Sequence, residues 1–250
     1  MTFMIRLLRF IFTLIVGIFF ILSFFVVLPF YFLIFTFYKK ERAAVIAHRL
    51  TRYWGKSLFI LFLIRVKVKH KEFIDPKKTY VFISNHQSQL DIPAYTVACT
   101  NTLRFLAKVE LTKAPLLGYV IRNLYISVDR KNKEARIKSM ENMMHSLKEG
   151  VSVFICPEGT RNKTSKPLLD FHEGAFRLAI ESQFPLAVLT VNNTAKLLSP
   201  LHPLELSPGV IYCTWSKPIE TKGMTMNDLP LLKELARELM LVSLNETGKK

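Results

Sequence analysis

The stretch YVFISNHQSQLD, residues Tyr80–Asp91, decides the fold because its character changes halfway along. The run YVFI (Tyr80–Ile83) is apolar enough to be a central strand of a sheet. Asp91 falls where a helix is expected to begin, since carboxylates are favoured at helix N-termini. A strand that passes at once into a helix is typical of α/β proteins. A tight turn between the two could bring the Asp91 carboxylate to His86, five residues earlier.

The same alternation of short apolar runs and helical stretches continues towards the end of the chain. Further strands are predicted at Leu103–Ala107, Leu124–Val128, Val151–Ile155, Leu186–Val191 and Val210–Trp215. Helices are predicted near Leu90–Cys99, Ala114–Arg122, Lys133–Lys148, His172–Glu181 and Asp228–Leu244. This pattern predicts an α/β fold with a mainly parallel central sheet flanked by helices, in which functional residues gather at the strand ends.

The N-terminal part of the chain differs from the rest. No charged residue occurs between Phe10 and Tyr38, and 16 of the 19 residues Phe10–Leu28 are Leu, Ile, Phe or Val. Entry of such a segment into a membrane is favoured by roughly 5–10 kcal/mol. Pro29 is expected to end or kink the helix near Leu28, and a second helix is expected to follow. We therefore predict a two-helix membrane-anchoring segment over residues 1–65 and an α/β domain over residues 66–250.

The net charge of +16 is unevenly distributed. Residues 1–80 hold 14 Lys and Arg against 3 Asp and Glu, a net charge of +11, whereas residues 81–250 hold 21 against 16, a net charge of +5. Basic residues beside an apolar segment suit anionic lipid headgroups. By the positive-inside rule they also place the following domain on the cytoplasmic face of the membrane. No helix-turn-helix, zinc-finger or RNA-recognition motif is present, so a nucleic-acid partner is not expected.

Several classes of site are excluded by their missing motifs. The chain has no GxSxG, GxGxxG or HExxH pattern. Cys99, Cys156 and Cys213 are widely spaced and form no CxxC pair, which indicates buried thiols rather than metal ligands. We therefore do not expect these cysteines to bind a metal.

Two His–Asp pairs share one spacing, so spacing alone cannot identify a catalytic pair. His70 and Asp75 lie in KVKHKEFIDPKK, a charged connector that a solvated loop explains fully. His86 instead follows the apolar strand, where one imidazole nitrogen could meet Asp91 and the other could face the strand-end cleft as a proton acceptor. Because no Ser or Cys nucleophile accompanies the pair, the nucleophile should be a hydroxyl of the substrate.

Cations stand at several predicted strand ends beside this pair. Lys108 ends FLAK, Arg130 ends SVDR, and FICPEGTR ends with Glu158, Gly159, Thr160 and Arg161. Each alone could belong to an ordinary turn. Gly159 would let the backbone approach a ligand closely, and Arg161 offers a planar fork for a phosphate. Together these residues predict a site for a phosphate-bearing substrate.

These stretches resemble the ordered sequence blocks of the glycerolipid acyltransferases. NHQSQLD resembles the first block, NHxxxxD; FLAKVELTKAPLLG resembles the segment after it, and RNLYISVDR the second block. PEGTR resembles the third block, FHEGAF the stretch after it, and FPLAVLTV the fourth. The resemblance runs from about residue 80 to 195. Within the family, the chain is most similar to the bacterial 1-acylglycerol-3-phosphate acyltransferases. Cys156 departs from the family, which usually has Phe before this proline, so altered packing is expected there.

The resemblance implies a reaction and a role for each residue. A fatty acyl group would pass from acyl carrier protein or coenzyme A to the sn-2 hydroxyl of a lysophosphatidic acid, with no further cofactor. His86 would be the base and Asp91 its partner. Lys108, Arg130 and Arg161 would be candidates for the phosphate, and Glu158 would position the acceptor or hold the loop. Two alternatives remain: another lysolipid acceptor such as lyso-ornithine lipid, or a non-catalytic membrane protein that only binds anionic lipid.

Overall fold

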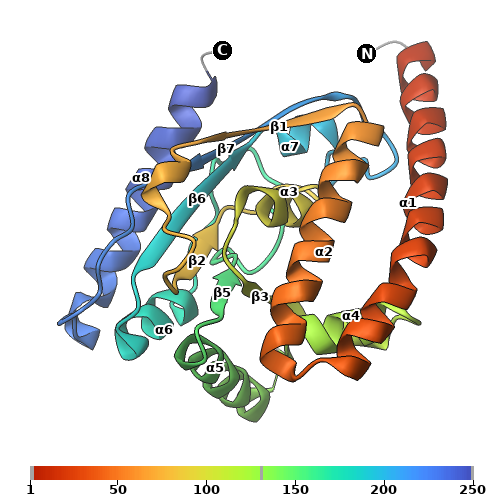
Figure 1. Cartoon of the computed structure of the whole chain (residues 1–250). Helices are drawn as coiled ribbons and strands as arrows, with labels where there is room; N and C mark the ends of the chain where they lie inside the picture. The colour runs from red at the N-terminus through yellow and green to blue at the C-terminus, as the bar shows by residue number, and fades with distance from the viewer. Residues whose placement is uncertain (1–2, 130–131, 249–250) are drawn as a thin grey trace.

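The centre of the protein is a seven-stranded sheet with the order β1-β7-β6-β2-β5-β3-β4. The computed structural model describes residues 3–129 and 132–248 (Figure 1). The strands are β1 (Ile64–Lys69), β2 (Val81–Ser84), β3 (Leu103–Lys108), β4 (Ile126–Val128), β5 (Ser152–Ile155), β6 (Leu186–Asn192) and β7 (Gly209–Trp215). All neighbouring strands are parallel except β6 and β7. The mainly parallel α/β sheet expected from the sequence is therefore confirmed.

Helices cover both faces of the sheet (Figure 1). They are α1 (Phe3–Phe37), α2 (Lys40–Leu61), α3 (Asp91–Ala98), α4 (Leu117–Leu124), α5 (Lys133–Lys148), α6 (Gly174–Ser182), α7 (Thr194–Leu197) and α8 (Leu229–Gly248), with short 3-10 helices η1 (Lys71–Phe73), η2 (Val109–Lys113) and η3 (Met226–Asp228). Alternate residues of β2 point to opposite faces, so Phe82 joins the core under α2 and α3, whereas Val81 and Ile83 join the core under α5, α6 and α8. Two cores thus fix the position of β2, whose end carries His86.

All six predicted strands are present, with ends shifted by at most two residues, and the structure adds a seventh, β1, that the sequence did not predict. The second half of its sequence, KVK (Lys67–Lys69), belongs to the stretch that predicts a charged connector. In the structure β1 pairs in parallel with β7 at the edge of the sheet. An edge strand that is half exposed tolerates alternating cations, which also discourage pairing with another chain.

Of the two outcomes predicted at Pro29, an end or a kink, the end of the helix is ruled out, because α1 continues through Pro29 as far as Phe37. A proline inside a helix costs about 3 kcal/mol. Leu28, Tyr31 and Ile34 are buried in a core shared with α2 and α4, and a buried large apolar side chain contributes about 1.5–3 kcal/mol. Packing therefore outweighs the interrupted hydrogen bond, and the chain turns at Tyr38–Lys39 instead.

Most of the surface of α1 is apolar and uncovered. Within the described residues, α1 is the one helix long and apolar enough to cross a membrane, with a mean hydropathy of 3.0 in its most apolar window and 17% of that window buried. By contrast, α2 places Leu58 and Phe59 in the core of the α/β domain. We conclude that α1 is suited to association with a membrane, while α2 fastens it to the sheet.

Candidate active site

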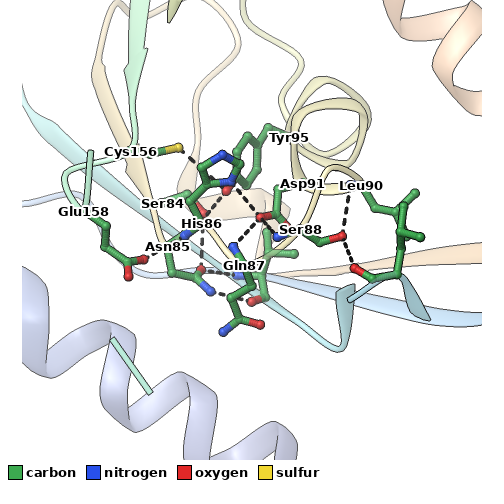
Figure 2. Close-up of polar contacts among 12 residues, drawn as sticks. Ser84, Asn85, His86, Gln87, Ser88, Leu90, Asp91, Tyr95, Cys156 and Glu158 are labelled. Carbon is green, nitrogen blue, oxygen red and sulfur yellow. Dashed lines mark hydrogen bonds and ion pairs between the residues drawn. The ribbon is translucent and has the colours of Figure 1, made fainter. Parts of the chain in front are cut away.

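His86 lies in the turn between β2 and α3, where its imidazole meets Asp91. The Asp91 carboxylate oxygen Oδ2 is 2.8 Å from His86 Nδ1. The same oxygen accepts hydrogen bonds from the backbone N–H groups of Gln87 (2.6 Å) and Ser88 (2.7 Å) (Figure 2). With Oδ2 already accepting two amides, Nδ1 is the donor to it. The second ring nitrogen, Nε2, is then left as a proton acceptor.

Burial makes this pair rigid. Asp91 is 1% exposed, whereas the side chain of His86 keeps 17% of its surface accessible. A buried carboxylate must be paired and hydrogen-bonded, and Asp91 meets this requirement through Oδ2, which closes the turn, and through its place at the N-terminus of α3. The carboxylate is therefore fixed, and only the imidazole is open to a ligand.

Three side chains that the sequence analysis did not single out hold this turn in place. Asn85 spans to β6, since its Nδ2 donates to the carbonyl of Val191 and its Oδ1 accepts from the Val191 N–H, both at 2.8 Å. Ser88 Oγ donates to the carbonyl of Leu198 at 2.7 Å. The Tyr95 hydroxyl donates to the carbonyl of Asn85, and burial raises the pKa of that phenol, so it stays a donor. Only Asn85 left a signal in the sequence, as a part of the NHxxxxD block.

Glu158 connects the loop after β5 to the loop that carries His86. Its Oε1 accepts from the backbone N–H of His86 at 2.8 Å, and its Oε2 accepts from the N–H of Leu169 at 2.9 Å. Burial raises the pKa of this carboxyl above its ordinary value, although the two backbone amides oppose the shift. Figure 2 shows Glu158 and Asp91 on opposite sides of His86. Of its two expected roles, this geometry favours holding the loop.

The other predicted residues that the structure describes lie at or after the carboxyl ends of β3 and β5. Gly159 adopts a left-handed conformation (φ +69°) that favours glycine, followed by an exposed Thr160 and a half-buried Arg161. No hydrogen bond or ion pair joins the Arg161 guanidinium to any other residue described in the structure. Lys108 ends β3, is 60% exposed, and lies 3.4 Å from the carboxylate of Glu110. Arg130 lies outside the described residues.

The second His–Asp pair serves as an internal control. His70 is exposed in the connector after β1, and its Nδ1 lies 3.3 Å from Glu72 Oε1 rather than beside Asp75. The Asp75 carboxylate instead accepts from the backbone N–H of Lys77 at 2.9 Å. Equal spacing thus gives two different structures, and only the pair that follows a buried strand and opens a helix comes together.

The geometry at His86 suits a general base rather than a nucleophilic relay. The neighbouring hydroxyls are engaged elsewhere, because Ser84 hydrogen-bonds to Asn85 and Ser88 to Leu198. An imidazole whose Nδ1 is held by a carboxylate can remove a proton through Nε2 and stabilise the resulting positive charge. Within the described residues, no three His, Cys, Asp or Glu side chains gather in a way that could hold a metal.

An apolar cavity of about 400 Å³ begins next to this turn. Gln89 and Leu90 of the turn line one end of it. The remaining walls come from α1, α2, α3 and the segment after α7, and include Val16, Gly17, Phe20, Trp54, Gly55, Leu58, Phe59, Phe62, Ile92, Pro93, Leu198 and Leu206. A volume of this size and lining suits a hydrocarbon chain.

The chain is similar to proteins that have been characterised. Residues 65–192 match the family model described as Acyltransferase. The chain is 32% identical over 188 residues to the 1-acyl-sn-glycerol-3-phosphate acyltransferase alpha of Mus musculus, which covers 74% of the chain and 66% of the mouse protein. It is 32% identical over 191 residues to the 1-acyl-sn-glycerol-3-phosphate acyltransferase of Saccharomyces cerevisiae, covering 73% and 61%. The matches therefore span slightly less than two thirds of these relatives.

The fold is also shared with a solved structure. The crystal structure of the 1-acyl-sn-glycerophosphate (LPA) acyltransferase PlsC from Thermotoga maritima matches with a TM-score of 0.79 and 23% identity, covering 98% of this chain and 97% of that chain. The family match over residues 65–192 includes nearly all of the blocks quoted from the sequence, so the expected family resemblance is confirmed.

Proposed function

The chain belongs to the acyltransferase family, and from this premise we propose that it transfers a fatty acyl group from a thioester to the free sn-2 hydroxyl of 1-acylglycerol-3-phosphate, giving phosphatidic acid. The observation that carries the proposal is the 2.8 Å contact between His86 Nδ1 and the buried Asp91 carboxylate. The relatives named above support the choice of acceptor.

In the proposed reaction His86 is the general base. Its Nε2 removes the proton from the acceptor hydroxyl as the oxygen bonds to the thioester carbonyl carbon. Asp91 stabilises the imidazolium that forms. The tetrahedral intermediate then breaks its carbon–sulfur bond, and the departing thiolate takes the proton from His86. A thioester is already activated, so these steps need neither a metal nor a redox cofactor.

The phosphate of the acceptor is assigned to the cations at the strand ends. Arg161 is the strongest candidate, because its guanidinium has no partner among the described residues and can bind two phosphate oxygens at once. Gly159 and Thr160 would bring backbone amides near the same phosphate, and Lys108 and Arg130 would add charge from the neighbouring strands. Glu158 would hold this loop in a fixed position relative to His86, through the hydrogen bond that it accepts from the His86 backbone N–H.

The apolar parts of the substrates are assigned to the membrane side. A fatty acyl chain would enter the 400 Å³ cavity beside Leu90, which is walled by the apolar helix α1 together with α2 and α3. The acceptor would reach His86 from the bilayer that α1 contacts. The basic residues that follow α1 favour the cytoplasmic face of the cytoplasmic membrane, where acyl carrier protein and coenzyme A thioesters are found.

An acyl-transfer assay tests the proposal. Purified protein in detergent or lipid nanodiscs would receive labelled acyl-coenzyme A or acyl-acyl carrier protein and a panel of acceptors. Label is expected in phosphatidic acid. Transfer to lyso-ornithine lipid but not to lysophosphatidic acid would keep the chemistry and replace the acceptor. No transfer to any acceptor, from a protein that binds anionic vesicles, would favour the non-catalytic alternative.

A further inference from the structure

A second, larger cavity lies on the face of the sheet away from α1. Its volume is about 640 Å³, and it lies beside the carboxyl ends of β3, β4 and β5. The apolar part of its lining includes Leu106, Val128, Met140, Met143, Ile155, Pro157 and Phe171. Helices α5, α6 and α8 form the remaining walls, with α6 between the other two in Figure 1. The proposed mechanism uses only the rim of this space, where Gly159 would contribute to binding the acceptor phosphate.

Cationic groups border the larger cavity. Arg136, in the first turn of α5, and Lys233, on α8, both line it. Neither side chain forms a hydrogen bond or ion pair with the described part of the chain. The lining also includes Gly174 and Ala175, the first residues of α6, where a helix N-terminus favours an anion. Glu173 is the one carboxylate in the lining that the structure describes, so positive groups prevail.

The larger cavity shares a wall with the candidate active site. Cys156, Pro157 and Gly159 line it. The same loop is hydrogen-bonded to the catalytic turn through Glu158 and to the far side through the His172 N–H, which donates to the Pro157 carbonyl at 2.8 Å. A ligand that crosses this loop could therefore reach from the larger cavity to His86.

The two cavities lie on opposite faces of the sheet. The 400 Å³ cavity is walled by α1, α2 and α3, next to the apolar surface suited to a membrane. The larger cavity is walled by α5, α6 and α8, and Figure 1 shows these helices across the sheet from α1 and α2. The acyl chain of a lipid acceptor approaches from the first side, and its phosphate reaches only the rim that the second cavity shares at Gly159. The rest of the second cavity is therefore open to a water-soluble substrate.

We propose that the larger cavity holds the phosphopantetheine arm of the thioester donor, with Arg136 and Lys233 binding its phosphate. This inference rests on the proposed function. The arm is long, contains an apolar gem-dimethyl segment and ends in a phosphate, and these properties match the apolar wall, the shared loop and the two cations. Coenzyme A and acyl carrier protein carry the same arm, so the site accepts the chemistry that they share.

Steady-state kinetics of charge-reversal variants test the proposal. Arg136→Glu and Lys233→Glu should each raise KM for the donor that the wild-type protein uses by at least about tenfold, because each loses a charge-assisted hydrogen bond and gains repulsion. Parallel series with acyl-coenzyme A and with acyl-acyl carrier protein identify which source supplies the arm. KM for lysophosphatidic acid should stay unchanged. With an acyl-pantetheine donor that lacks the phosphate, both variants should match the wild type.

Lys148→Glu is the matched control, because Lys148 is an exposed residue of the same helix as Arg136, at the end far from the larger cavity. It should leave every KM unchanged, and thermal melting should show that all three variants are folded. Unchanged donor KM in Arg136→Glu and Lys233→Glu overturns the proposal. A raised KM for lysophosphatidic acid instead of the donor also overturns it, since the cavity would then serve the acceptor.

A direct binding measurement separates this inference from the proposed function. If the wild-type protein transferred no acyl group, the proposed function would fail, but titration calorimetry with coenzyme A alone would still test the cavity. Binding that is at least about tenfold weaker in Lys233→Glu than in Lys148→Glu supports the site. Equal affinity of these two variants for coenzyme A rejects it.

Discussion

Replacing Asp91 by asparagine tests the electrostatic half of the proposed base. The substitution preserves shape, and an amide oxygen can still accept from the Gln87 and Ser88 backbone N–H groups. The negative charge 2.8 Å from His86 Nδ1 disappears. At an effective dielectric constant of about 20 this charge is worth about 6 kcal/mol to the imidazolium. Because the imidazole is partly solvated, we expect a loss of about 3–5 kcal/mol, or on the order of 10²–10⁴-fold in kcat.

The same substitution has a separate and smaller effect on stability. Asp91 Oδ1 is buried and has no hydrogen-bond partner among the described residues, so an amide NH₂ there would lack an acceptor. This costs about 1–3 kcal/mol, which corresponds to roughly 2–12 °C in Tm. Thiol release would be followed with saturating acceptor below the melting temperature, with Asp75→Asn as the control of equal spacing. A folded Asp91→Asn protein with kcat within threefold of wild type would refute the electrostatic argument.

Three further variants probe the surroundings of the pair. Arg161→Lys keeps the charge but loses the planar fork, so KM for lysophosphatidic acid should rise by roughly tenfold, whereas an unchanged value would remove Arg161 from the phosphate site. Burial raises the pKa of Glu158 above 4.5, so its contribution to stability is greatest below pH about 4.5 and falls as the pH rises through the folded pKa. Glu158→Gln should remove this pH dependence and lower Tm, because an amide cannot accept from both His86 and Leu169; melting curves from pH 4 to 8 that run parallel to those of the wild type would contradict this. Deleting residues 1–37 should release the protein from membranes, and undiminished sedimentation with vesicles would show that other surfaces suffice.

The features that the sequence predicted correctly depend on neighbours along the chain. Six strands were found because their apolar runs are short, and the contact of His86 with Asp91 was anticipated because five residues form one turn. Residues separated by a long stretch of chain escaped prediction. The Glu158 bond to His86 joins positions 72 apart, and the Asn85 bonds to Val191 join positions 106 apart. A single sequence holds no signal for such pairings.

Other failures arose where tertiary packing overrides local propensity. Pro29 predicted an end or a kink of the helix, and the end does not occur, because Tyr31 and its neighbours are buried against α2 and α4. The cations of KVK (Lys67–Lys69) predicted a connector, but these residues belong to β1, which pairs with β7, the last strand of the chain among the described residues. In both cases the deciding contacts come from elements that the local sequence does not contain.

The comparison of His86→Ala with His70→Ala tests the central claim most directly, because the two histidines have the same spacing to an aspartate and differ only in context. Acyl transfer from labelled donor to lysophosphatidic acid would be measured for both variants, with folding confirmed by thermal melting in detergent. His86→Ala should lower kcat by about 10²–10⁴-fold, the usual contribution of a general base, whereas His70→Ala should stay within a few-fold of wild type. A fully active His86→Ala protein, or an inactive His70→Ala protein, would contradict the assignment of His86 as the base.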